Sequence, residues 1–401
     1  MDWQTLMQNY ANVLLQIGVG LQPGQGLHIS IPVEGAELAR VLSRQAYQMG
    51  ASDVVVRFVD ETLEELDAGL SEQEILLEHL RKEYEAMTAL SEKEFAFLRL
   101  YSPSFLQPLP GKQERYTAWS NQTALLASAL RNHTGTRGWT CIACCPTRRW
   151  ASHVFPDMDA NAALDKLWEL LFHMTRADTG DPIAGWHAHS DRIVAQGVKM
   201  TAAQFDMVHI LGPGTDLKVG LIPSHVWGGG RFVNTRGVPA VPNIPTEELA
   251  TTPDRLRTEG VVSSVRPLNY QGSVVDEFQI RFHGGMAVEW HAKKGENVLT
   301  EIITHDDSSC YLGEVAIVPG GGLIGSTNTV YLCTLLDENA TCHLALGAGF
   351  PMHVREEAMR EKVNRSSVHV DFMIGNSELR IYGIYPDGSE KLIFDLGEWT
   401  I

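Results

Sequence analysis

Apolar side chains follow two alternating patterns along the N-terminal part of the chain. Short runs rich in Val, Ile and aromatic residues alternate with stretches in which apolar residues return every three or four positions. The first pattern is typical of strands and the second of amphipathic helices. Strands are expected over residues 26–31, 53–59, 95–101 and 139–144, and helices over 3–17, 37–49, 72–90, 117–130 and 159–174.

Strands that alternate with helices favour a parallel sheet covered by helices. We therefore expect an α/β N-terminal domain with a parallel-type sheet. After Gly180 the pattern changes, because Gly and Pro become more frequent and most apolar runs are short and β-rich. The pattern predicts strand, turn and strand over 208–217, paired runs around Gln271-Gly272, a strand over 286–291 and a helix over 297–304. A larger α+β C-terminal domain is the expectation.

The boundary between the two parts is expected at a stretch rich in turn-forming residues. Three prolines and a glycine lie within residues 103–111, and such clusters are typical of loops and linkers. We place the N-terminal α/β domain at 1–108 and the C-terminal domain at 109–401. A second part that begins near Gly180 is the alternative.

Composition narrows the class of protein. The chain has 401 residues and a net charge of -17, which argues against nucleic acid as a partner because phosphate binding requires a basic surface. Six cysteines in a chain of this length do not form a disulfide scaffold. No signal peptide or membrane span is evident in the sequence, so we expect a soluble, cytoplasmic protein.

The strand predicted over residues 368–375 carries the first candidate for chemistry. Side chains alternate across a strand, so His369 and Asp371 are expected on one face, and Val370 and Phe372 on the other. An imidazole beside a carboxylate on a rigid element could form half of a metal site. The alternative is an edge strand with two polar residues that face water.

Two further polar residues interrupt apolar runs. Glu314 is the one carboxylate in residues 312–319, and a buried carboxylate needs a cation, a set of donors or an exposed strand end. His343 lies among small and apolar residues, where a histidine with satisfied hydrogen bonds is the more common finding. Carboxylates and imidazoles without thiolates would suit zinc, cobalt, manganese or iron.

Three other stretches have simpler explanations. Thr246, Glu247 and Glu248 could form a helix N-terminus, where a Thr caps and carboxylates favour the helix dipole. The three cysteines in 141–145 lack a second Cys or His pair at zinc spacing and are interpreted as buried structural thiols. Residues 320–325 fit GxGxxG, but no helix start follows, so no nucleotide cofactor is expected.

Taken together, six stretches resemble the M29 family of metallo-aminopeptidases. They occur in the family's order, most densely from about Gly212 to the C-terminus. The stretches are Asn243-Ile244-Pro245-Thr246-Glu247-Glu248, Glu259-Gly260-Val261-Val262, Leu312-Gly313-Glu314-Val315-Ala316, Leu336-Asp337-Glu338-Asn339-Ala340, His343-Leu344-Ala345-Leu346-Gly347 and His369-Val370-Asp371.

The resemblance implies an aminopeptidase that acts on small peptides through a metal-activated water. It implies a C-terminal domain that carries two divalent metal ions (zinc, cobalt or manganese), and a homodimer. Glu314 is the implied general base. Glu247 aligns only as a neighbour of a ligand. The implied metal ligands are Glu248, Glu314, His343, His369 and Asp371.

The chain departs from the family at one position. The family carries a tyrosine shortly after the metal-binding His343, and this chain has Phe350 there. A phenyl ring cannot donate a hydrogen bond to a reaction intermediate; Tyr331 or His353 could supply a donor instead. Two alternative functions therefore stay open: an iron-dependent ring-cleaving dioxygenase of a related lineage, and a non-catalytic metal-binding homologue.

Overall fold

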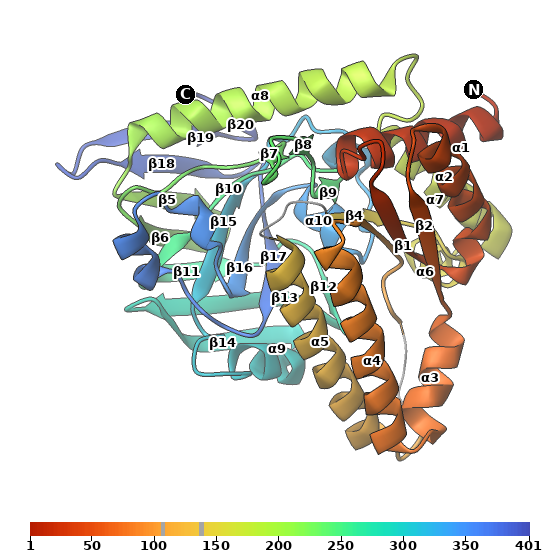
Figure 1. Cartoon of the computed structure of the whole chain (residues 1–401). Helices are drawn as coiled ribbons and strands as arrows, with labels where there is room; N and C mark the ends of the chain where they lie inside the picture. Colours follow the sequence, from red (N-terminus) through yellow and green to blue (C-terminus); the bar gives the residue numbers. More distant parts are fainter. Residues whose placement is uncertain (106–108, 136–139) are drawn as a thin grey trace. The chain divides into compact units, whose positions relative to one another are not determined.

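The chain forms two compact units. A computed structural model describes residues 1–105, 109–135 and 140–401 (Figure 1). One unit comprises Met1–Ala188 and Arg231–Pro245, and the other His189–Gly230 and Thr246–Ile401. Residues 109–135 and 140–188 lie with the first unit, and strand β4 (Thr140–Cys144) pairs with β3 in its sheet. The domain boundary predicted at 108/109 adjoins residues outside the described ranges and stays a prediction.

The first unit is built around a five-stranded sheet in the order β2-β1-β3-β4-β9, and every pairing in it is parallel. The predicted parallel-type sheet is therefore confirmed. Its strands are β1 (Gly26–Pro32), β2 (Asp53–Val59), β3 (Ala96–Tyr101), β4 and β9 (Asn243–Ile244), and two short strands, β7 (Phe232–Val233) and β8 (Pro239–Ala240), pair separately.

The helices of this unit agree with the apolar spacing at most places. They are α1 (Trp3–Asn12), continued by a π-helical turn (Val13–Gly18), α2 (Ala36–Gln48), α3 (Glu61–Leu70), α4 (Gln73–Glu92), α5 (Gln113–Gly135), α6 (Arg148–Val154) and α7 (Ala160–Met174). Helices α3 and α6 were not predicted. Cys141, Cys144 and Cys145 are buried free thiols, as expected.

A further helix, α8 (Pro182–Ala203), was not predicted, because the sequence analysis expected mostly short β-rich runs after Gly180. Trp186, Ile193 and Met200 are buried at intervals of seven residues, which is helical spacing. The signal was weak in the sequence because the buried positions between them are polar or small, such as His189 and Ser190. Among the described residues, no helix is long and apolar enough to cross a membrane.

The second unit is mostly antiparallel sheet. A nine-stranded sheet runs β12-β13-β11-β6-β5-β18-β19-β20, with β14 paired to β13, and a four-stranded sheet runs β10-β15-β16-β17. The strands of the larger sheet are β5 (Met207–Gly212), β6 (Thr215–Leu221), β11 (Pro253–Ser263), β12 (Leu268–Tyr270), β13 (Ser273–His283), β14 (Met286–Lys294), β18 (Arg380–Ile384), β19 (Glu390–Asp395) and β20 (Glu398–Trp399).

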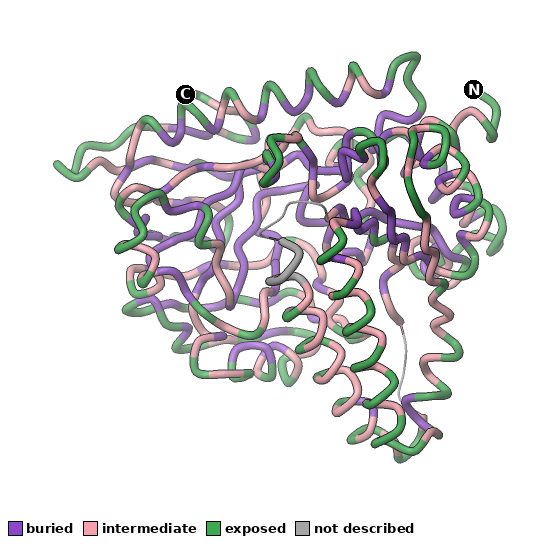
Figure 2. Tube along the Cα trace, in the orientation of Figure 1, coloured by how far each residue is buried: buried purple, intermediate pink, exposed green. Residues whose placement is uncertain are grey.

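The four-stranded sheet consists of β10 (Leu249–Thr251), β15 (Leu312–Ile317), β16 (Cys342–Gly347) and β17 (His369–Gly375). Short helices α9 (Glu296–Ile303) and α10 (Thr334–Glu338) and three 3-10 turns (Gly325–Thr327, Pro351–His353 and Glu357–Lys362) complete the unit. One core holds side chains of both sheets, among them Phe278 of β13 and Phe372 of β17, whose ring centroids are 5.6 Å apart. Figure 2 shows buried residues along β15 and β16.

One local interpretation was wrong. Thr246 does not start a helix, because the next regular element is strand β10, which pairs with β15. The alternative explanation of Glu247 and Glu248 as helix-capping carboxylates therefore fails. The glycine-rich stretch 320–325 runs into a 3-10 turn (Gly325–Thr327), so no α-helix begins there as a dinucleotide-binding motif would require.

Candidate metal centre

The register of the four-stranded sheet places four of the predicted residues on one face. Ala345 of β16 pairs with Glu314 of β15 on one side and with Asp371 of β17 on the other. Residues directly opposite in an antiparallel pair share a face. His343 and His369 lie two positions from Ala345 and Asp371, so both share that face as well. The small Ala345 side chain leaves space between the two carboxylates.

Short distances confirm that these side chains meet. Ligand atoms of Glu314, His343 and Asp371 all lie within 4.8 Å of one another. The Nε2 atom of His369 is 3.1 Å from Glu314 Oε2 and 3.1 Å from Asp371 Oδ1. Glu248, from the segment before β10, joins the cluster through its Oε2 atom, which is 3.1 Å from His343 Nε2. All five residues predicted as ligands therefore lie together.

Glu247 points elsewhere. Its Oε2 atom is 3.5 Å from Nε2 of His189, on α8, and its backbone N–H donates to Asn339. Successive side chains of an extended segment point in opposite directions. This separates Glu247 from Glu248, in agreement with the expectation that Glu247 is only a neighbour of the site.

Backbone carbonyls fix the orientation of both imidazoles. His343 Nδ1 lies 2.8 Å from the carbonyl oxygen of Glu338, and His369 Nδ1 lies 2.7 Å from that of Ala348. Each Nδ1–H therefore donates to the backbone, and each Nε2 faces the carboxylates. Metal-binding histidines show this arrangement, in which a hydrogen bond at one nitrogen directs the other toward the ion.

The cluster concentrates negative charge in a buried place. Burial raises the pKa of Glu314, against the hydrogen bond and charge of His369. Burial also favours a high pKa for Asp371, but the charge of His369 outweighs it and holds the pKa below its usual value. Burial lowers the pKa of His343, yet the hydrogen bond to Glu248 outweighs this and raises it to about 9. Protons on the imidazoles thus balance part of the carboxylate charge.

A sixth residue, Glu338, was missed by the sequence interpretation. It ends α10, is buried, and has a pKa raised well above its usual range by burial and then by nearby carboxylates, with Asp371 first among them. Asp337 anchors this helix, because its carboxylate lies 3.2 Å from Arg266 and accepts hydrogen bonds from two backbone N–H groups. The sequence did contain a signal for Glu338, because Asp337, Glu338 and Asn339 follow directly after the apolar residues 335–336.

The donor set fits divalent metal ions. Four carboxylates and two imidazoles converge, without a thiolate, which is the donor set of zinc, cobalt, manganese or iron. Asp371 Oδ1 is buried, and His369 Nε2 lies 3.1 Å from it without a hydrogen bond of good geometry, although buried acceptors are nearly always satisfied. A cation would satisfy this oxygen, and both imidazoles would bind it after losing their Nε2 protons.

Phe350 borders the cluster. Its ring centroid is 4.9 Å from that of His369 and 5.9 Å from that of His353. The Thr252 hydroxyl fixes the Phe350 backbone by accepting a hydrogen bond of 2.8 Å from its N–H. Of the two proposed substitute donors, Tyr331 donates its hydroxyl to Thr327, whereas His353 lies beside Phe350.

Comparison with known proteins agrees with this geometry. The family model described as thermophilic metalloprotease (M29) matches residues 3–399. The chain belongs to this family. Among its relatives, Aminopeptidase 2 of Geobacillus stearothermophilus is 37% identical over 99% of this chain and 98% of its own. Aminopeptidase T of Thermus thermophilus is 36% identical over 98% of each chain.

A solved structure shows the same fold as this M29 chain. Wild-type AmpT from Thermus thermophilus superposes with a TM-score of 0.91 and 34% identity, and the match covers 100% of both chains. The predictions of the M29 family and of a metallo-aminopeptidase, a hydrolase that acts on peptide bonds, are confirmed. These comparisons do not favour the alternative of a ring-cleaving dioxygenase.

Proposed function

We propose that this chain releases N-terminal residues from small peptides with two divalent metal ions, zinc, cobalt or manganese. Glu248, Glu314, His343, His369 and Asp371 are the proposed ligands, and Glu338 is added to them. The observation that carries the proposal is the convergence of these carboxylates and imidazoles at one buried place, where Glu314, His343, His369 and Asp371 share a face of the four-stranded sheet.

The proposed reaction needs metal ions that activate water and a side chain that accepts the proton of that water. Divalent ions supply Lewis acidity, which lowers the pKa of a bound water and polarises a peptide carbonyl. Glu314 is the proposed general base, because its buried carboxylate lies within the cluster, 3.1 Å from His369 Nε2. It would take a proton from the attacking water and give it to the leaving amine.

The charge of the cluster suits a free N-terminus. Glu248, whose side chain is 17% exposed, is more accessible than Glu314, at 8%. An α-ammonium group approaching this acidic site is favoured, whereas a peptide carboxylate is repelled. The proposal therefore concerns exopeptidase action at the N-terminus. A homodimer and a cytoplasmic location remain predictions.

Removal of metal is the direct test. We expect chain loaded with zinc, cobalt or manganese to cleave aminoacyl-p-nitroanilides and short peptides, and chelator to abolish the cleavage until metal is added back. His369→Ala should remove metal and activity together, since the imidazole contacts two of the proposed ligands.

His283→Ala is the matched control, because the His283 side chain is 82% exposed; its metal content and rate should equal those of the parent chain. Full peptidase activity in metal-depleted protein would contradict the proposal. Oxygen consumption with one iron per chain would instead support the dioxygenase.

A further inference from the structure

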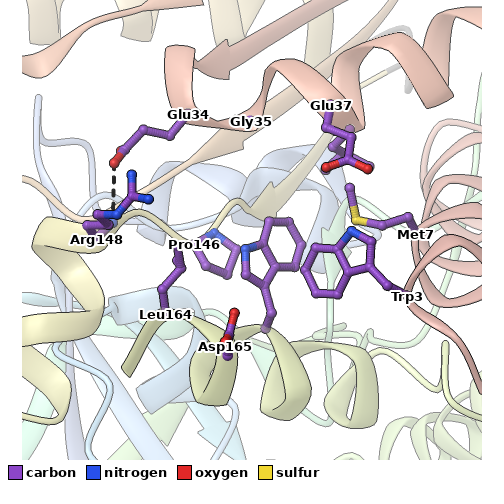
Figure 3. A pocket seen from close by; sticks show the side chains of 11 residues that line it. Trp3, Met7, Glu34, Gly35, Glu37, Pro146, Arg148, Leu164 and Asp165 are labelled. Atoms are coloured by element: carbon purple, nitrogen blue, oxygen red, sulfur yellow. Dashed lines mark hydrogen bonds between the residues drawn. The ribbon is translucent and has the colours of Figure 1, made fainter. Parts of the chain in front are cut away.

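The first unit contains a pocket that the proposed peptidase reaction does not use. Its volume is about 240 Å³, and α1, α7 and the segments that follow β1 and β4 line it (Figure 3). All its lining residues belong to the first compact unit. It thus lies at the carboxyl ends of parallel strands, which is where open α/β sheets bind their ligands.

Two indole rings form the apolar part of this pocket. The ring centroids of Trp3 and Trp168 are 5.6 Å apart, and the planes meet at 80°. Trp168 and Met7 are buried, whereas Trp3 is 41% exposed. An exposed tryptophan held against a buried one offers a rigid aromatic surface, which attracts cations through the ring quadrupole.

Carboxylates line the same pocket. Glu37 comes from α2 and Asp165 from α7, and Figure 3 shows both among the lining side chains. Among the residues that the structure describes, neither carboxylate makes a hydrogen bond or an ion pair. Glu34 accepts a hydrogen bond of 3.3 Å from the backbone N–H of Arg148, whose guanidinium Nε donates to Asn161. The pocket therefore holds an excess of negative charge.

The indole rings and carboxylates of this pocket disfavour anionic, neutral and large ligands. Helix α2 begins at the pocket, but Glu37 in its first turn and Glu34 in the 3-10 turn before it (Val33–Gly35) would repel an anion. A neutral ligand would take water from the carboxylates without replacing their hydrogen bonds. The volume lies below the roughly 300–1,000 Å³ of sites for drug-sized molecules, so the ligand is small.

We infer that this pocket binds a small organic cation, an alkylammonium, with its charge between Glu37 and Asp165 and its alkyl groups against Trp3 and Trp168. The inference does not depend on the proposed peptidase mechanism. A ligand of this class is an amine rather than an inorganic ion, because the apolar surface of two indoles would otherwise stay unused.

Isothermal titration of the full chain with tert-butylammonium, and with the isosteric neutral tert-butanol, tests the inference. We expect saturable binding of one tert-butylammonium ion per chain and no saturable binding of the alcohol. Trp3→Ala should weaken binding about fivefold to thirtyfold, the range of a cation–π contact. The double variant Glu37→Gln/Asp165→Asn should weaken it about threefold to tenfold.

Three controls separate this pocket from other acidic places. Glu169→Gln, on the same helix as Asp165 but outside the pocket, should leave the affinity unchanged. His369→Ala should also leave it unchanged, whereas loss of binding there would assign the amine to the metal cluster and overturn the inference. Equal binding of tert-butanol would overturn the inference as well. So would unchanged affinity for tert-butylammonium in the Glu37→Gln/Asp165→Asn variant, which should fold normally because both changed side chains are exposed. Peptidase rates of the pocket variants should match the parent chain.

Discussion

A chain in which Gln replaces Glu314 is expected to hydrolyse aminoacyl-p-nitroanilides about a hundredfold to ten-thousandfold more slowly, which is the usual contribution of a general base. The amide keeps the size of the carboxylate but cannot accept the proton of the attacking water. Glu314 lies 3.1 Å from His369 Nε2 and pairs with Ala345 of β16, so the substitution falls inside the cluster.

The measurement is kcat under saturating substrate, with metal content determined on the same samples. Glu301→Gln on α9, an exposed carboxylate outside the cluster, is the control and should leave kcat unchanged. A Glu314→Gln chain that binds metal and retains the parent kcat would show that another group takes the proton.

Restoring a hydroxyl at position 350 should accelerate the reaction. Phe350→Tyr is expected to raise kcat about a hundredfold, because one donor to a tetrahedral intermediate contributes roughly a hundredfold to a thousandfold. The Phe350 ring lies 4.9 Å from the ring of His369, and the Thr252 hydroxyl already fixes its backbone. The backbone therefore needs no rearrangement to present the hydroxyl at the border of the site.

Comparison of kcat for the parent chain, Phe350→Tyr and the exposed control Phe58→Tyr measures this effect. Phe58→Tyr should not change kcat. An unchanged rate in Phe350→Tyr, together with a large loss in His353→Phe, would show that His353 already supplies the donor. An unchanged rate in both variants would contradict a role for any donor at this border.

The sequence predicted the site residues best where local rules apply. Alternation along a strand placed His369 and Asp371 on one face, and their atoms lie 3.1 Å apart. The cost of a buried carboxylate drew attention to Glu314, which is buried in the structure. The parallel sheet followed from strands that alternate with helices, and β2 has the predicted bounds.

Other features depend on distant parts of the chain. Local rules explained Glu248 as part of a helix start, but pairing of Leu249 with Ile317 makes the next residues a strand. Glu338 lies at the end of a helix of five residues, α10. Arg266 holds this helix in place by a hydrogen bond to Asp337, which is 71 positions away in the sequence. Helix α8 was missed because one of its buried positions is the polar residue His189. The imidazole of His189 can be buried because it forms a hydrogen bond with the backbone carbonyl of Thr246, a partner 57 residues away that no local pattern reveals.

The most direct test of the account is anomalous diffraction from crystals of the metal-loaded chain, at the absorption edges of zinc, cobalt and manganese. The account predicts two anomalous peaks per chain, both among Glu248, Glu314, Glu338, His343, His369 and Asp371. Crystals of active, metal-loaded protein with no anomalous peak between these six side chains would contradict it.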